Sequence, residues 1–144
     1  MKEVWESIYR RRGGNGAYTR LFEDLEQSQQ ATLLAGLAQR DAELPVIGSL
    51  MSGDNWLILS TERLVWCADG KRSELPLLAL RDTHVDRGAL RTGPSGKTTL
   101  DRIEIVTFDE GEHVIRVEPG PPFFGFLNVL KNIGTRNRNR MRSK

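Results

Sequence analysis

The sequence predicts an α+β fold in which an antiparallel β-domain is flanked by helical segments. Between Pro45 and Glu118, apolar and polar residues alternate with a period of two, which is typical of half-buried strands. Before Pro45 and after Gly120, apolar residues recur every three or four positions, which indicates amphipathic helices. Because no helix-length segment separates the alternating stretches, we expect the strands to pair as an antiparallel meander.

Residues 1–43 are predicted to form an N-terminal helical extension. A short helix over residues 2–10 is followed by the glycine-rich stretch RRRGGNG, which ends regular structure. From residue 17 to about residue 39 the apolar spacing is helical again, with a break at 28–30, so we expect a second, bent helix. Its apolar side chains would pack on a sheet face or edge, or form a dimer contact. They include Leu21, Phe22 and Leu25.

Seven strand-length segments, rich in β-branched and aromatic residues, fill the region 44–118. Turn sequences such as SGDN, DGK and DEGE separate them. The segments are PVIGSL, NWLILS, RLVWCA, RSELPL, LRDTHVD, TTLDRIEIVTF and EHVIRVE. We expect an inner face that includes Trp56, Ile58, Leu64 and Trp66.

The segment after Gly120 carries start and stop signals for a helix. Pro121 and Pro122 suit the first turn, where a backbone N–H has no internal partner. Lys131 favours the negative end of the helix dipole, and Gly134 is a typical residue just after a helix. The sequence therefore predicts an amphipathic helix that ends before Gly134. Its apolar stripe comprises Phe123, Phe126, Leu127, Leu130 and Ile133.

Seven strands followed by one amphipathic helix is the element order of the pleckstrin-homology-like (PH-like) superfold. Within residues 56–80, the turn Thr61-Glu62-Arg63-Leu64 joins two apolar strands and resembles a turn of bacterial PH-like and GRAM-like domains. The resemblance covers roughly residues 44–134. It implies a seven-stranded antiparallel β-sandwich or partly open barrel, capped at one open end by the C-terminal helix.

PH-like domains are best known for binding phosphoinositides through Lys and Arg residues in the loop between their first two strands. Here that loop, Met51 to Asn55, contains no basic residue and one acidic residue, so the resemblance does not carry the usual lipid site over. Lys71 and Arg72 in the next hairpin form a small basic spot that could bind an anionic ligand or simply be solvated. PH-like folds also bind proteins through strand edges and the groove of the C-terminal helix.

The GPSGKT stretch resembles the end of a phosphate-binding loop, but its context argues against one. A P-loop requires G-x-x-x-x-G-K-[ST], and Arg91 stands where the first glycine belongs. Gly96 and Lys97 lead into an alternating strand rather than into a helix. The sequence therefore predicts a hairpin loop here and no nucleotide site.

No pattern in the sequence predicts catalysis, a cofactor or a metal site. His84, His113 and Cys67 are the soft metal ligands, and they lie far apart in the sequence. Cys67 follows Trp66 within a strand, which indicates a buried structural thiol. His113 alternates with apolar residues and is expected to point inward near a strand end. We therefore predict a protein that is not an enzyme.

The positive charge is concentrated at the C-terminal end. Residues 1–43 and 44–130 have net charges of −1 and −3, whereas residues 131–144 have +6, so a nucleic-acid-binding face on the body is not expected. Residues 135–144 are predicted to be a disordered basic tail. The tail could bind anionic lipid or RNA, or only keep the protein soluble, and the lack of interleaved aromatic residues disfavours RNA. Its candidate anion-binding residues are Arg136, Arg138, Arg140 and Arg142.

These observations favour a cytoplasmic, non-catalytic binding module with a protein partner. A single cysteine and an N-terminus without an apolar signal region suit the cytoplasm. One concrete form is a small immunity protein that neutralises a toxin by covering its active site. The alternative is a peripheral membrane adaptor held on anionic lipid by the arginine-rich tail. The apolar helical extension is also compatible with a homo-oligomer.

Overall fold

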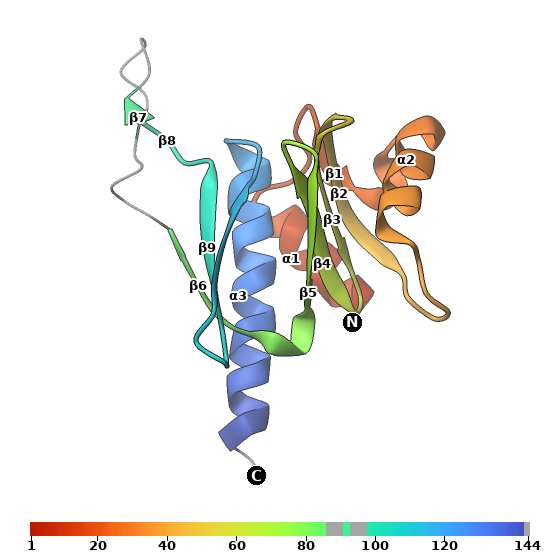
Figure 1. Ribbon diagram of the computed structural model, residues 1–144. Coiled ribbons are helices and arrows are strands. Elements are labelled where there is room, and N and C mark those ends of the chain that lie inside the picture. The colour runs from red at the N-terminus through yellow and green to blue at the C-terminus, as the bar shows by residue number, and fades with distance from the viewer. Residues whose placement is uncertain (86–90, 93–97, 143–144) are drawn as a thin grey trace.

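The computed structural model describes residues 1–85, 91–92 and 98–142 and shows an α+β fold with two antiparallel sheets (Figure 1). The larger sheet has the strand order β1-β2-β3-β4-β5, the smaller has the order β10-β9-β6, and β7 pairs with β8. The strands of the larger sheet are β1 (Thr19–Leu21), β2 (Pro45–Ser52), β3 (Asn55–Ser60), β4 (Arg63–Ala68) and β5 (Lys71–Pro76). The remaining strands are β6 (Leu80–Val85), β7 (Arg91–Thr92), β8 (Thr98–Thr99), β9 (Arg102–Thr107) and β10 (Glu112–Arg116). Each of the seven predicted segments contains a strand, and the two main sheets are not closed into a barrel.

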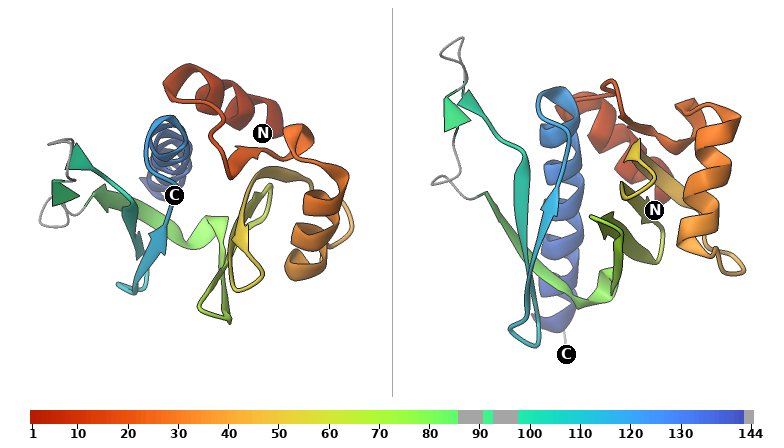
Figure 2. Two further views of the ribbon diagram at one scale, coloured as in Figure 1. Left: turned by 90° about the horizontal axis from the view of Figure 1, so that it is seen from above. Right: turned by 45° about the horizontal axis from the view of Figure 1, so that its top comes forward.

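Three α-helices cover the sheets. They are α1 (Lys2–Arg12), α2 (Gln27–Leu37) and α3 (Pro121–Arg142), and two short 3-10 turns accompany them, η1 (Phe22–Asp24) and η2 (Leu77–Ala79). Helices α1 and α3 lie side by side on the inner side of the two sheets, whereas α2 lies on the opposite face of the larger sheet (Figure 2). Among the described residues, no helix is both long and apolar enough to cross a membrane.

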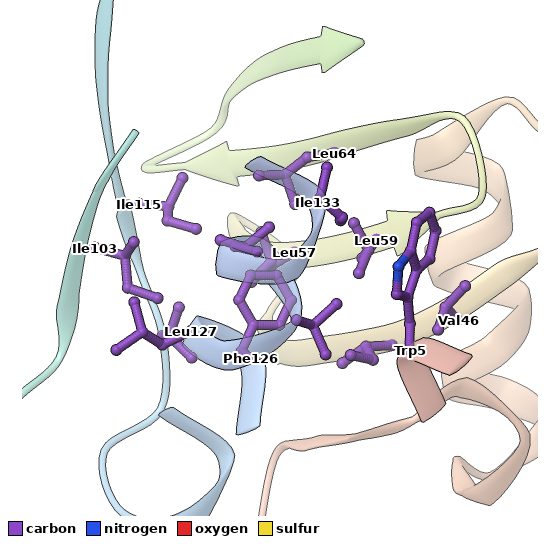
Figure 3. Close-up of a cluster of buried hydrophobic side chains, with 14 of the residues drawn as sticks. Trp5, Val46, Leu57, Leu59, Leu64, Ile103, Ile115, Phe126, Leu127 and Ile133 are labelled. Atoms are coloured by element: carbon purple, nitrogen blue, oxygen red, sulfur yellow. The ribbon is translucent and has the colours of Figure 1, made fainter. Parts of the chain in front are cut away.

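The inner core fills the space between the two sheets, α1 and α3 (Figure 3). Its labelled members include Leu57, Leu59 and Leu64 from the larger sheet, Ile103 and Ile115 from the smaller sheet, Trp5 from α1, and Phe126, Leu127 and Ile133 from α3. An outer cluster lies beneath α2 and contains Leu25, Leu33, Leu37, Ile58 and Val65. The larger sheet is therefore covered on both faces, and the smaller sheet supplies buried residues to the inner core.

Two of the four residues predicted to face the inner core do so. Leu64 and Trp66 belong to the inner core, but Trp56 and Ile58 pack in the outer cluster against α2. The pairing explains the error, because Ile58 is opposite Val65 whereas Leu57 is opposite Trp66. When both faces of a strand are buried, its sequence is a continuous apolar run, and such a run does not reveal which alternate residues point inward.

The predicted helix over residues 17–39 is wrong in its first half. Residues 19–21 form β1, which pairs with β2 and joins the larger sheet. Leu21 belongs to the inner core, whereas Phe22 and Leu25 pack in the outer cluster, so their helix-like spacing arises from a strand and a 3-10 turn. The helix α2 begins after Glu26, whose backbone N–H donates to the Gln29 side chain in a capping box. The polar residues 28–30 thus mark the start of a helix rather than a bend within one.

Two further predictions are wrong, namely that the last helix ends before Gly134 and that a disordered tail follows it. Helix α3 continues to Arg142. Gly134 lies inside this helix, where an added Cβ would be only 2.9 Å from the Arg81 carbonyl oxygen, so glycine allows β6 to approach closely. Three residues later, the buried Asn137 amide donates to the carbonyls of Leu77 and Leu80, both at 2.7 Å. These contacts fix the helix beyond Gly134.

The predicted hairpin loop with Gly96 and Lys97 lies outside the described residues. Its flanking strands β7 and β8 pair antiparallel, with Arg91 opposite Thr99 and Thr92 opposite Thr98. Thr98 is therefore in a strand, whereas the residue after a P-loop lysine must enter a helix.

Replacement of Asn137 by alanine tests the anchoring of α3. We expect Asn137→Ala to lower the free energy of unfolding by about 1–3 kcal/mol, because two buried carbonyl groups lose their donor. This loss should occur although alanine is the better helix former. Urea denaturation measures the change, and Asn128→Ala is the matched control, since the Asn128 amide bonds within α3 to the Phe124 carbonyl. Equal stability of the two variants would contradict the anchoring.

Candidate binding sites

Arg63 is a buried guanidinium that joins four parts of the chain. Its side chain is 5% exposed and that of Glu43 is 0% exposed; Arg63 Nε lies 2.9 Å from Glu43 Oε2. Nη1 lies 2.7 Å from Glu74 Oε2. Nη2 donates to the carbonyls of Leu37 and Ala38 at 2.8 and 2.9 Å. Arg63 therefore satisfies carbonyl groups at the end of α2, which a helix leaves without internal partners.

Ser60 completes this cluster, and the sequence analysis did not identify it. Its hydroxyl donates to Glu43 Oε2 at 2.5 Å and accepts the backbone N–H groups of Glu62 and Arg63 at 3.1 Å. Burial alone would raise the pKa of Glu43, but hydrogen bonds from Arg63 and Ser60 lower it to about 2. The sequence did contain a signal for this contact. Ser60 precedes Glu62 by two residues and Arg63 by three, and short hydroxyl side chains commonly accept hydrogen bonds from the backbone of a following turn.

The candidate pair Lys71 and Arg72 does not form a joint anion site. Arg72 Nε donates to the Gly36 carbonyl at 2.9 Å, and its Nη2 donates to Glu74 Oε2 at 3.1 Å. Lys71 is exposed beside the β4–β5 turn. The guanidinium of Arg72 is therefore engaged in holding α2 to β5.

The four arginines near the end of α3 separate into three groups. Arg138 docks on β6, with its Nη1 3.5 Å from Asp82 Oδ1. Arg136 and Arg140 are one helical turn apart and both line a cavity at one end of the inner core. Arg142 is exposed. Only two of the four predicted residues are thus brought together at a hollow in the surface.

This cavity, here named the α1–α3 cavity, has a volume of about 460 Å³. It lies where the start of α1, the β3–β4 turn, the segment from β5 to η2 and the last turns of α3 meet, at the end of the molecule that carries both termini (Figure 1). Its apolar lining comprises Met1, Trp5, Pro76, Leu77, Leu78 and Ile133. Its charged lining comprises Arg40, Glu62, Arg63, Glu74, Arg136 and Arg140. The indole N–H of Trp5, a residue that is only 5% exposed, has no hydrogen-bond partner within the described part of the chain.

A second hollow, here named the inter-sheet cleft, opens between the two sheets near the β2–β3 and β4–β5 turns and has a volume of about 590 Å³. Its lining includes Met51, Trp56 and Trp66 from the larger sheet and Arg102, Val114 and Arg116 from the smaller sheet. Arg102 and Arg116 stand directly opposite each other on β9 and β10. Within residues 1–85, 91–92 and 98–142, neither guanidinium has a hydrogen bond or ion pair. Sequence analysis did not identify this pair, because strand register alone brings the two residues together.

The soft metal ligands do not form a joint site. Cys67 is buried, as predicted. His113 packs edge-on against Trp66 with ring centroids 5.7 Å apart, which confirms its inward orientation. His84 is exposed on β6. Across the described residues, no group of three or more His, Cys, Asp or Glu side chains could hold a metal ion.

Comparisons of the chain with protein-family models, with curated proteins and with solved structures found no match. Membership of the PH-like class therefore stays a prediction from the sequence, based on the turn around Arg63 and on the order of the predicted elements.

The buried pair of Glu43 and Arg63 makes a pH-dependent prediction. Glu43→Gln should lower the free energy of unfolding at pH 7 by about 3 kcal/mol, because Arg63 loses its buried counter-charge. A carboxylate with a lowered pKa stabilises the fold above its ordinary pKa of 4.5, and this contribution is lost as the pH falls towards 2. Wild type and variant should therefore converge between pH 4.5 and 2 in urea denaturation. Glu112→Gln, at an exposed position, is the control, and a difference independent of pH would contradict the ion-pair origin.

Proposed function

We propose that this chain is a non-catalytic binding module of the PH-like class that binds a protein partner in the inter-sheet cleft. The class is supported by the seven strands β2 to β6, β9 and β10, which pair antiparallel in two sheets and precede α3, together with the turn at Arg63. The observation that carries the proposal is the composition of the cleft. Tryptophan, methionine and arginine are enriched in the buried centres of protein interfaces, and all three line this cleft.

The charges of the cleft indicate the chemistry of the partner. Arg102 and Arg116 are neighbours on adjacent strands, where two like charges destabilise each other. Asp69 is the acidic residue in the lining, and within the described part of the chain it has no ion pair with either arginine. A carboxylate from a partner would relieve this repulsion and gain charge-assisted hydrogen bonds. The cleft therefore fits an acidic segment with an apolar side chain directed towards Trp66.

The edge of the smaller sheet offers a second means of attachment. In the described sheets β10 pairs with β9 alone, so its other edge is open to an extended segment. Val114 on this strand is 56% exposed and lines the cleft together with Arg116. A partner strand beside β10 would therefore reach the cleft directly.

One concrete form of this function is an immunity protein that neutralises a toxin by covering its active site. An interface of this kind requires a stable, specific contact with one partner and no catalysis by the immunity protein. The cleft supplies aromatic anchors for such a contact, and its two arginines supply specificity for an acidic surface.

Affinity purification of the tagged protein from its own cells, at low and moderate salt, tests this proposal. We expect a stoichiometric protein that survives moderate salt. The double variant Arg102→Glu and Arg116→Glu should weaken its binding roughly tenfold or more, because the variant reverses the charge of the cleft. The control is the charge reversal Arg12→Glu at the exposed end of α1, outside the cleft. Absence of any partner, or equal binding by both variants, would contradict the proposal.

The alternative, a peripheral membrane adaptor, retains support from the end of α3. The helix holds Arg136, Arg140 and Arg142 at exposed positions, and each basic residue near an anionic membrane contributes about 1 kcal/mol of attraction.

Binding to liposomes with and without phosphatidylserine tests the adaptor function. Deletion of residues 135–144 is an unsuitable test, because it would remove the structural bonds of Asn137. We expect the double variant Arg140→Gln and Arg142→Gln to abolish salt-sensitive binding and leave the fold intact. Binding that is absent in the wild type, or unchanged in the variant, would exclude this function.

A further inference from the structure

We propose that the α1–α3 cavity binds a small apolar molecule that carries one carboxylate, such as a medium-chain fatty acid. This site is separate from the inter-sheet cleft, so the inference does not depend on the proposed protein partner. Its volume of about 460 Å³ lies within the range of roughly 300–1,000 Å³ that is typical of small-molecule sites.

The hydrocarbon part of the ligand is indicated by the walls. Trp5, Leu77 and Ile133 come from α1, η2 and α3, and they belong to the inner core as well as to the cavity. Leu78 also lines the cavity and is 66% exposed. A hydrocarbon chain in the cavity would remove this surface from water, at roughly 25 cal/mol for each Å² buried.

Most polar groups of the lining are already engaged, which leaves the walls little capacity to bind a polar molecule. Arg63 is satisfied by Glu43, Glu74 and two carbonyls at the end of α2. Arg40 lies 3.9 Å from Glu74. The Asn137 amide nitrogen donates to two backbone carbonyls. These bonds also hold the walls in place without a ligand.

The charges that remain indicate a single negative charge on the ligand. Arg136 and Arg140 have no carboxylate partner within the described residues and stand one turn apart, where like charges repel. Glu62 is the lining carboxylate without an ion pair, and the amino group of Met1 lies 3.9 Å from Glu3, so the three unpaired side chains together carry a net charge of +1. A monocarboxylate balances this charge, whereas a phosphate ester with two charges would leave an excess negative charge beside apolar walls.

The indole N–H of Trp5 is a further observation that points to a ligand. It is buried and has no hydrogen-bond partner within the described residues, and a buried donor without a partner costs about 1–3 kcal/mol. Trp5 lines the cavity, so a ligand seated there changes the surroundings of this indole. The same residue therefore reports occupancy of the site.

Titration of the ¹⁵N-labelled protein with sodium decanoate tests the proposal. The chain has three tryptophans, and Trp56 and Trp66 line the inter-sheet cleft, so their indole signals report the other site. Trp5→Phe assigns the remaining signal. We expect the Trp5 indole signal to move and to saturate at one decanoate for each chain, while the signals of Trp56 and Trp66 stay in place.

Two comparisons separate the role of the charge from that of the hydrocarbon. Decan-1-ol and decyltrimethylammonium, which share the chain but lack the carboxylate, should bind more weakly than decanoate by roughly tenfold or more. Arg136→Gln and Arg140→Gln should each weaken decanoate binding by roughly tenfold and leave the alcohol unaffected. Arg142→Gln, on the same helix but outside the lining, should bind decanoate as the wild type does.

Three results would overturn the proposal. They are an unmoved Trp5 signal at millimolar decanoate, a shift that never saturates, and equal binding of decanoate and decan-1-ol. A shift of the Trp56 or Trp66 signal in place of Trp5 would assign the ligand to the inter-sheet cleft and would overturn it as well. Thermal unfolding of each variant shows whether a loss of binding arises from a loss of fold.

Discussion

The buried guanidinium of Arg63 determines how the elements around the larger sheet are joined. It binds the carbonyls at the end of α2, the carboxylate of Glu43 in the connection to β2, and Glu74 on β5. Without it the carboxylate of Glu43, which is 0% exposed, would lose its counter-charge, and an unpaired buried charge is among the most costly defects in a fold. The outer helix, the connecting loop and two strands are therefore positioned by one side chain.

The same network decides which charged residues are available for binding. Arg40, Arg63, Arg72 and Arg138 contact carboxylates or backbone carbonyls of the protein itself. Among the arginines that line the two hollows, those without such partners in the described structure are Arg102 and Arg116 at one and Arg136 and Arg140 at the other. These two pairs are the places where we propose that an anion binds.

The fold could be predicted from sequence where local signals and tertiary structure agree. The seven predicted segments are rich in β-branched and aromatic residues and have turn residues between them, and each contains a strand. The errors occur where tertiary contacts override local signals. Gly134 ends no helix because Asn137 anchors the next turn to η2, and the spacing of Leu21 and Leu25 is helical although a strand and a 3-10 turn carry them. The candidate sites were less predictable from the sequence. Arg102 and Arg116 are neighbours only because of the register between β9 and β10, and Trp5 and Arg140 line one cavity although they come from the first and last helices.

The packing of α1 against α3 also affects the order in which the fold can form. These helices are the first and last elements of the described chain, so their contact closes the longest loop available. Contacts of high sequence separation lower folding rates, because the entropy of loop closure is lost before the contact contributes energy. The hairpins from β2 to β5 need only local closures and can form first. The inner core is completed only when α3 is present, and until then the apolar side of α1 is exposed to association with other chains.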